Sequence, residues 1–318
     1  MKSYSSKLEI SFETHKITKQ NRIVKDLELV NVVAVLPGTT QKNHEIIISG
    51  RYDSLNIIRK KDAFTGSGAD ASGVSLVMEV SRVMSQYEWP KTIVFIAFAG
   101  EEQGLFGSRA HAKAAKDAKR KIDAVFNNDI IGNDVSGEGR RVTDLVNVYS
   151  GDPMDSPSRA LARYVREMAE REYPAMKANP VFSGDQFSCG GGDTPFHHLG
   201  FAAIRFTTPV GNYANQHSPT DTFENASPSH TARVVGVDAA AAASLALAPT
   251  MPEVMRFNSA GVLVGPSLTR GKGRATTRPS SRPPLPRSMK SRVTASASAR
   301  RSRHIGNAKY TSATSPSS

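Results

Sequence analysis

The sequence predicts a single three-layer α/β domain with a mostly parallel central sheet flanked by helices, followed by a disordered C-terminal tail. Three observations predict this fold class. Apolar strand-like runs alternate with helical segments, polar residues follow several of these runs, and basic Ser/Pro-rich sequence begins after residue 250. We therefore expect a folded domain over residues 1–250 and a tail over residues 251–318.

The clearest expected strand is 92–99, a continuous apolar run that is typical of a strand buried on both faces of a sheet. Further strand-like runs are 29–36, 44–49, 123–131, 144–149 and 201–207. Helices are expected at 71–87, from about Leu105 onward, at 156–172 and at 229–248. The first of these helices places Leu76, Val80, Val83 and Tyr87 on one face, which predicts that this face packs on the sheet. No apolar run has the length of a membrane span.

Two adjacent carboxylates, Glu101 and Glu102, follow the apolar run 92–99 after a single glycine. Ligands bind at the carboxyl ends of the strands in an α/β sheet. Neighbouring residues there point in different directions, so one glutamate can hold a metal while the other faces a substrate water. The alternative is that both acids stand in the first turn of a helix because its dipole favours them.

Polar residues also mark four other segments in chain order. These segments are Ser49-Gly50-Arg51-Tyr52-Asp53-Ser54, Asp70-Ala71-Ser72-Gly73, Asn127-Asn128-Asp129 and His217-Ser218-Pro219-Thr220-Asp221-Thr222. With the Glu-Glu pair, the chain resembles the zinc-dependent exopeptidases that include bacterial leucyl aminopeptidase, glutamate carboxypeptidase and glutaminyl cyclase. That family has G-H-x-D-S, D-x-A-S-G, E-E, N-x-D and H-x-P-x-D-T in this order. The resemblance covers roughly residues 7–248.

The resemblance implies a zinc-dependent exopeptidase of the aminopeptidase type, with a peptide substrate and a metal-activated water. Carried over by motif, Asp70, Glu102 and His217 would hold one zinc ion. Asp70 and Asp129 would share a second ion with the early histidine of the family. Glu101 would be the general base, and Asp53 would orient the early ligand.

The departures from the family pattern change these expectations. Arg51 replaces the early histidine, and a guanidinium has no free lone pair for zinc. We expect one zinc ion, with two as the alternative, and we expect Arg51 to pair with Asp129 and supply positive charge there. A strict count back from Gly73 would place Ala69 in the slot that we assign to Asp70. Relatives usually carry a histidine after the residue that corresponds to Asp193.

Each site residue also has a simpler interpretation. Asp70 could be a helix N-cap, and His217 could be a solvated loop residue. Asp129 could cap the strand end or pair with a surface base. Asp53 could pair with Arg51, and Asp193 could face the substrate or occupy a turn. At the level of function, the alternatives to an impaired or intact exopeptidase are an inactive relative that serves as a binding or structural module, and a one-zinc enzyme of the glutaminyl cyclase kind.

The tail holds all of the net charge. Residues 251–318 contain 13 Lys or Arg and one acid, whereas the first 250 residues contain 28 basic and 28 acidic residues. We expect a disordered segment that binds polyanions non-specifically, and no specific nucleic-acid partner. A second hypothesis is that the tail results from a shifted reading frame.

The first residues contain no apolar core of signal-peptide length. The chain as written is therefore expected to stay in the cytoplasm. If it is a truncated member of the family, the parent protein is expected to be secreted or periplasmic.

Overall fold

A computed structural model describes residues 1–57, 70–184 and 190–249, together with two short strands further on. An eight-stranded sheet in the order β1-β2-β4-β3-β5-β8-β6-β7 runs through its centre. Its strands are β1 (Glu9–Ile17), β2 (Leu27–Leu36), β3 (Gln41–Arg51), β4 (Lys91–Phe98), β5 (Lys121–Asn128), β6 (Leu145–Tyr149), β7 (Lys177–Val181) and β8 (Ala203–Thr207). The two short strands β9 (Arg256–Phe257) and β10 (Leu263–Val264) pair with each other.

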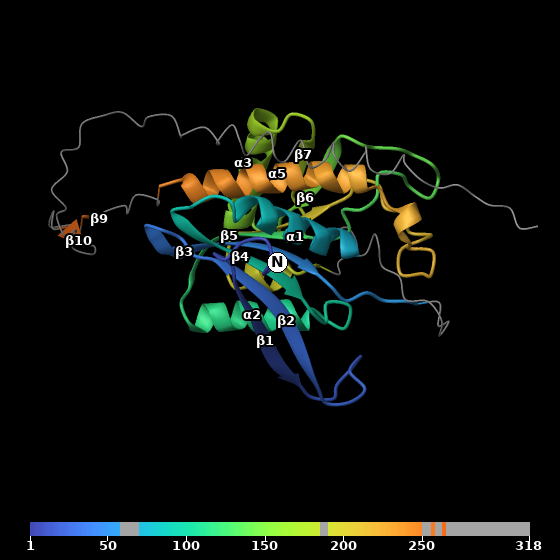
Figure 1. The fold of residues 1–318 in the computed structure, drawn as a ribbon, viewed down its shortest axis with the longest axis horizontal. Coiled ribbons are helices and arrows are strands. Elements are labelled where there is room, and N and C mark those ends of the chain that lie inside the picture. The colour runs from blue at the N-terminus through green and yellow to red at the C-terminus, as the bar shows by residue number, and fades with distance from the viewer. Residues whose placement is uncertain (58–69, 185–189, 250–255, 258–262, 265–318) are drawn as a thin grey trace, which may run out of the picture.

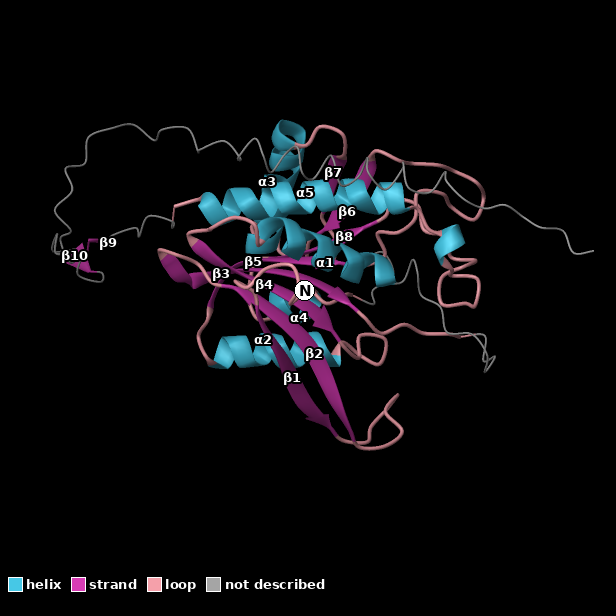
Figure 2. Ribbon diagram, in the orientation of Figure 1, coloured by secondary structure: helices cyan, strands magenta, loops and turns pink. Residues whose placement is uncertain are grey.

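Helices cover both faces of the sheet (Figures 1 and 2). They are α1 (Ser72–Met84), α2 (Phe106–Asp117), α3 (Pro157–Glu172), α4 (Thr194–His198) and α5 (Pro228–Leu247). Along β3, Ile46 and Ile48 pack in the core beneath α1, α3 and α5, whereas Ile47 packs in the smaller core on the side of α2. This alternation follows from the two-residue period of a strand. The predicted three-layer α/β fold is therefore confirmed.

The centre of the sheet is parallel, which determines where a site can form. The pairs β3–β4, β3–β5 and β5–β8 are parallel, while β2 is antiparallel to β4 and β6 is antiparallel to β8. The carboxyl ends of β4, β3, β5 and β8 consequently lie side by side, and we call this row of strand ends the carboxyl edge of the sheet. The four strands lie in the middle of the sheet, and further strands flank them on both sides.

The expected elements differ from the observed ones in a few places. Helix α1 ends at Met84 rather than at residue 87, although Tyr87 beyond its end still packs against the core. Strand β5 ends at Asn128, so Asp129 follows the strand instead of lying within it. Strands β1 and β7 and the short helix α4 have no counterpart among the elements expected from the sequence.

Some predictions fall outside the described residues. They concern Ala69 in the shortened loop and nearly all of the tail over residues 251–318, including its expected disorder. Among the helices that the structure describes, none combines the length and apolarity needed to cross a membrane.

Candidate active site

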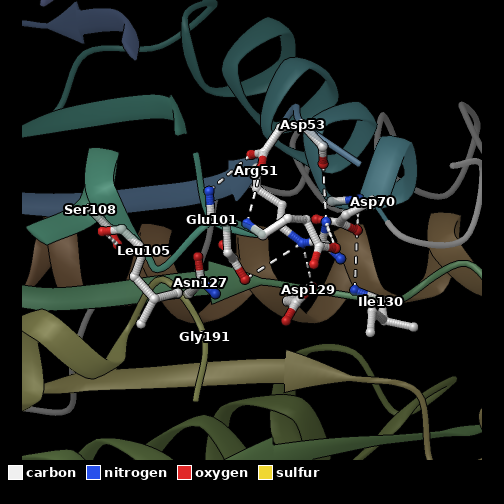
Figure 3. A network of polar contacts seen from close by, with 12 residues as sticks. Arg51, Asp53, Asp70, Glu101, Leu105, Ser108, Asn127, Asp129, Ile130 and Gly191 are labelled. Carbon is white, nitrogen blue, oxygen red and sulfur yellow. Dashed lines mark hydrogen bonds and ion pairs between the residues drawn. The ribbon is translucent and has the colours of Figure 1, made fainter. Parts of the chain in front are cut away.

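The guanidinium of Arg51 lies at the centre of the site, at the last residue of β3 (Figure 3). Its Nε donates to Asp129 Oδ1 at 3.1 Å and lies 3.5 Å from Glu101 Oε1. Its Nη1 donates to Glu102 Oε1 at 2.7 Å and to the backbone carbonyl of Asp53 at 3.0 Å. The Arg51 side chain is only 3% exposed. The expected pairing of Arg51 with Asp129 is confirmed, and it extends to both glutamates.

Burial and neighbouring charges shift the pKa values of Asp70, Glu101 and Glu102 in different directions. Burial, and after it the neighbouring Asp129 carboxylate, raise the pKa of Asp70 and of Glu101 well above their usual range. Burial would also raise the pKa of Glu102, but its hydrogen bond with His217 and the charge of Arg51 together lower that pKa. Burial opposes the charge on Arg51, yet the surrounding carboxylates raise its pKa well above the ordinary value. Arg51 is therefore a permanent cation within an acidic cluster.

The loop that presents the two glutamates is fixed by Asp53. The Asp53 carboxylate accepts the backbone N–H of Glu101 at 3.2 Å through Oδ1 and that of Glu102 at 3.0 Å through Oδ2. Gly100 begins this loop with φ +68°, where an added Cβ would come within 2.3 Å of Leu29. Asp53 thus orients the loop through its backbone. The alternative pairing with Arg51 also exists, but it uses the backbone carbonyl of Asp53 instead of its carboxylate.

Asp70 joins the start of α1 to the end of β5. Its Oδ1 accepts the N–H of Gly73 at 2.9 Å, the hydroxyl of Ser72 at 3.0 Å and the N–H of Ile130 at 3.1 Å. Ile130 has φ +57°, an uncommon conformation for a β-branched residue. Asp70 Oδ2 is buried and has no hydrogen-bond partner in the described part of the chain. Asp70 therefore binds the first turn of α1 through Oδ1, although Ala71 occupies the N-cap position.

His217 reaches the cluster from the loop after β8. Its Nε2 lies 2.9 Å from Glu102 Oε1, and its side chain is 24% exposed. The backbone carbonyl of His217 accepts the N–H of Ile57 at 3.0 Å, which ties this loop to the segment after β3. The interpretation of His217 as a merely solvated residue is therefore wrong.

Arg205 is a second buried cation of the site and is absent from the residues predicted from the motifs. It lies in β8, and its Nη1 is 3.6 Å from Asp129 Oδ2 and donates to the Gly190 carbonyl at 2.9 Å. Its guanidinium also lies over the ring of Tyr149, 5.1 Å from the centroid. A single arginine within the otherwise apolar run 201–207 was the available signal. Asp129 is thus held between two arginines. Both arginines are buried, so the alternative that Asp129 pairs with a surface base is wrong.

Asp193 is buried at the N-cap position of α4. Its side chain makes no capping hydrogen bond, and an added Cβ at Gly191 would lie 3.1 Å from its Oδ1. Asp193 therefore stands directly before the short helix α4.

The chemistry of the donor set is that of a zinc site. Two carboxylates and an imidazole, from Asp70, Glu102 and His217, are a suitable set for a catalytic zinc with one open position. The unpaired Asp70 Oδ2 and the contact between Glu102 and His217 agree with this assignment. For a second ion, Arg51 replaces the imidazole and already binds Asp129 and Glu102. Within the described residues, no three His, Cys, Asp or Glu side chains are assembled as a metal-binding group. In this arrangement Arg51 is the cation that holds the carboxylates together.

A sequence profile of peptidase family M28 matches residues 31–242. Two fungal proteins, each described as a probable zinc metalloprotease, are similar to the chain. The protein from Pyricularia oryzae is 33% identical over 72% of this chain and 52% of its own length. The protein from Pyrenophora teres f. teres is 29% identical over 77% of this chain and 57% of its own length. The chain belongs to peptidase family M28, a family of zinc metallopeptidases, and it spans about half the length of these relatives.

Solved structures agree with this assignment. An aminopeptidase from Aneurinibacillus sp. strain AM-1 has a TM-score of 0.53 and 26% identity, and the match covers 70% of this chain and 49% of that chain. A glutaminyl cyclase from Fimbriiglobus ruber has a TM-score of 0.59 at 16% identity, covering 74% of this chain and 81% of that chain. The second likeness shows the fold alone.

Proposed function

We propose that this chain is an exopeptidase of the aminopeptidase type that works with one zinc ion and cleaves N-terminal residues from peptides. The observation that supports this proposal best is the cluster around Arg51 at the carboxyl edge of the parallel strands. Arg51 is 3% exposed and contacts Asp129 at 3.1 Å, Glu102 at 2.7 Å and Glu101 at 3.5 Å. The permanent positive charge of Arg51 stabilises the negative charge of these carboxylates, as a second metal ion would.

Asp70, Glu102 and His217 would hold the zinc ion. When bound, zinc supplies Lewis-acid chemistry that polarises the scissile carbonyl and makes a water more acidic. Glu101 accepts a proton from the attacking water and passes it to the leaving amine. Asp53 keeps Glu101 and Glu102 in place by accepting both of their backbone N–H groups. Each of these roles uses a residue whose position the contacts above define.

Two measurements on the purified full chain test the proposal. Elemental analysis is expected to give one tightly bound zinc ion per chain. A panel of aminoacyl anilides is expected to be hydrolysed, with turnover lost when the zinc is removed by a chelator and recovered when it is returned. A His217→Ala variant serves as the matched negative, because two carboxylates alone are a poor zinc site.

The same measurements identify the alternatives. Two tightly held zinc ions would contradict the role of Arg51 as the second cation. A chain with neither zinc nor hydrolysis would be an inactive relative that keeps the fold as a binding or structural module. The pairing of Arg51 with three of the four carboxylates is the observation that favours this second candidate, because it stabilises the cluster without metal.

A further inference from the structure

A cavity of about 330 Å³ lies between the start of α2 and helix α4. We call it the α2–α4 pocket, and the described residues that line it are Leu105, Arg109, Thr194, Pro195, His198 and Leu199. Leu105 directly precedes α2 and donates its N–H to the backbone carbonyl of Glu101 at 2.9 Å. The pocket therefore adjoins the loop that presents the two glutamates.

The two helices that form the pocket are held together by the chain itself. The ring of Phe196 in α4 is fully buried, and its centroid lies 6.0 Å from that of the His111 imidazole in α2. Near the end of α2, Lys116 Nζ donates to the Leu199 carbonyl at 2.8 Å. The walls of the pocket are thus fixed by packing and by a hydrogen bond, as is usual for a ligand site that is formed in advance.

The lining of the pocket combines apolar and basic side chains. Leu105 and Pro195 are buried, whereas Arg109 and His198 are exposed. None of the described residues that line the pocket is acidic. Helix α2 contains three Lys or Arg residues and a single aspartate, and Lys113 already pairs with that aspartate at 2.6 Å. A guanidinium and an imidazole on this positively charged face favour an anion, and the planar guanidinium suits a carboxylate in particular.

The pocket lies on one particular side of the proposed general base. In Figure 3, Leu105 and Asp70 lie on opposite sides of Glu101. Asp70 belongs to the proposed zinc site, whereas Glu101 passes a proton to the leaving amine. The part of the peptide that follows the scissile bond is therefore expected on the Glu101 side, towards Leu105. In a short peptide this part ends in a carboxylate.

We propose that the α2–α4 pocket binds the free C-terminal carboxylate of a short peptide substrate through Arg109 and His198. This proposal rests on the proposed function, since it names the substrate class of the same site. Each added residue lengthens an extended peptide by about 3.5 Å, so the carboxylate of a long chain lies out of reach of the pocket. Short peptides with a free carboxyl end are therefore the preferred substrates.

Pairs of peptides that differ only at the carboxyl end test the pocket separately from catalysis. The full chain with Glu101→Gln, saturated with zinc, is titrated calorimetrically with Leu-Gly, Leu-Gly-Gly and Leu-Gly-Gly-Gly, each as the free acid and as the C-terminal amide. At one or more of these lengths we expect the acid to bind about ten times more tightly than the amide. This ratio is typical of a hydrogen bond to a charged group.

Variants of α2 provide the contrast. Arg109→Gln removes the guanidinium and is expected to reduce the ratio of acid to amide affinity to less than about threefold. Lys113→Gln is the matched control, because Lys113 lies one turn further along α2, has a side chain that is 74% exposed and does not line the pocket. It loses the same charge and is expected to keep the full ratio. Thermal unfolding of each variant confirms that the chain is folded.

Any of three outcomes would overturn the α2–α4 pocket. They are absent or equal binding of acid and amide at every length, an unchanged ratio in folded Arg109→Gln, and an equal loss of the ratio in Lys113→Gln. The last outcome would assign the effect to the general charge of α2.

Zinc content and anilide hydrolysis of the parent chain are read independently, because aminoacyl anilides carry no carboxylate. A chain that hydrolyses anilides but binds acid and amide equally would keep the proposed function and lose the pocket. A chain that prefers the acids without hydrolysing anilides would keep the pocket and reject the proposed function.

Discussion

We expect Arg51 to determine how many metal ions the site holds. Arg51→His restores an imidazole next to Asp129, and Asp70 Oδ2 is a buried oxygen with no partner among the described residues. We expect the zinc content of the purified variant to rise from one to two ions per chain, measured by elemental analysis. Hydrolysis of aminoacyl anilides is expected to rise with it, because two ions stabilise the nucleophile and the developing oxyanion better than one. Unchanged zinc content would show that Asp70 does not reach a shared position.

The same residue is expected to stabilise the fold. Arg51→Met removes the cation that Asp129 and Glu102 share and leaves Asp129 with Arg205 alone, at 3.6 Å. Breaking a buried ion pair in this way typically costs about 3–5 kcal/mol. Urea unfolding at neutral pH measures this loss. The double variant Arg51→Met with Asp129→Asn is expected to recover part of the stability, because one uncompensated charge is removed. A loss below about 1 kcal/mol in the single variant would contradict a central role for this ion cluster.

Glu101 and Glu102 are adjacent but are expected to respond differently to the same substitution. Glu101→Gln should keep the zinc ion and reduce turnover by about two to four orders of magnitude, the typical contribution of a positioned general base. Glu102→Gln is the matched variant and should lose zinc instead. Elemental analysis and anilide hydrolysis on both variants distinguish the roles. Zinc loss in Glu101→Gln would mean that the two roles are exchanged.

Helix α5 contains a buried acid that makes stability depend on pH. Burial raises the pKa of Asp238 from 3.8 to about 7, and the hydrogen bond from Asn128 opposes this only in part. In the unfolded chain Asp238 ionises above about pH 4, whereas in the folded chain it stays protonated until about pH 7. The folded state therefore has the whole stabilising effect of protonated Asp238 below pH 4. The free energy of unfolding then falls as the pH rises towards 7.

Asp238→Asn removes this dependence because an amide does not ionise. We expect the stability of the variant relative to the parent chain to increase between pH 4 and 7 and then to level off. The total increase in the free energy of unfolding, variant minus parent, is about 4 kcal/mol at most. Urea unfolding across this range measures it. His230 in the same helix has a pKa lowered by burial to about 4 and gives the opposite slope, but it is present in both chains and cancels in the difference. A constant difference would contradict the buried titration of Asp238.

Which elements could be predicted from sequence depended on their burial. The strand β4 is buried at every position, so its apolar run was unambiguous. In contrast, β1 and β7 form the two ends of the sheet, where one neighbour is missing and the sequence need not be apolar. Strand β7 even contains Pro180, which is tolerated at a sheet edge. Helix α4 has five residues, too few to show a periodic pattern.

For the site, motif order correctly placed Arg51, Glu101, Glu102 and Asp129 in one cluster, and it joined His217 to Glu102. It could not show that Asp53 binds two backbone N–H groups, because every residue except proline offers such a donor. Arg205 was missed because one arginine in a short strand has no motif around it. The motifs could thus predict which residues lie close together. The hydrogen-bond partner of each atom could be found only from the folded structure.

At the scale of the whole chain, the positive charge of residues 251–318 predicts that this segment binds polyanions independently of the domain. These residues contain 13 Lys or Arg and one acid, and the first 250 residues are formally neutral. The full chain is expected to be retained on a heparin column at low salt and to elute as salt increases, whereas a chain ending at residue 250 should pass through. Equal retention of both chains would assign the binding to the domain instead.

The hydrogen bond between His217 and Glu102 joins residues that are 115 positions apart in the chain. Arg51 and Asp129 in the same cluster are 78 positions apart. Contacts between such distant residues form only after long loops have closed, which slows folding. The cluster is therefore expected to be completed late in refolding, once β3, β4, β5 and β8 have paired. Recovery of the Glu102–His217 contact would then report on the last stage of folding rather than on the formation of any single helix or strand.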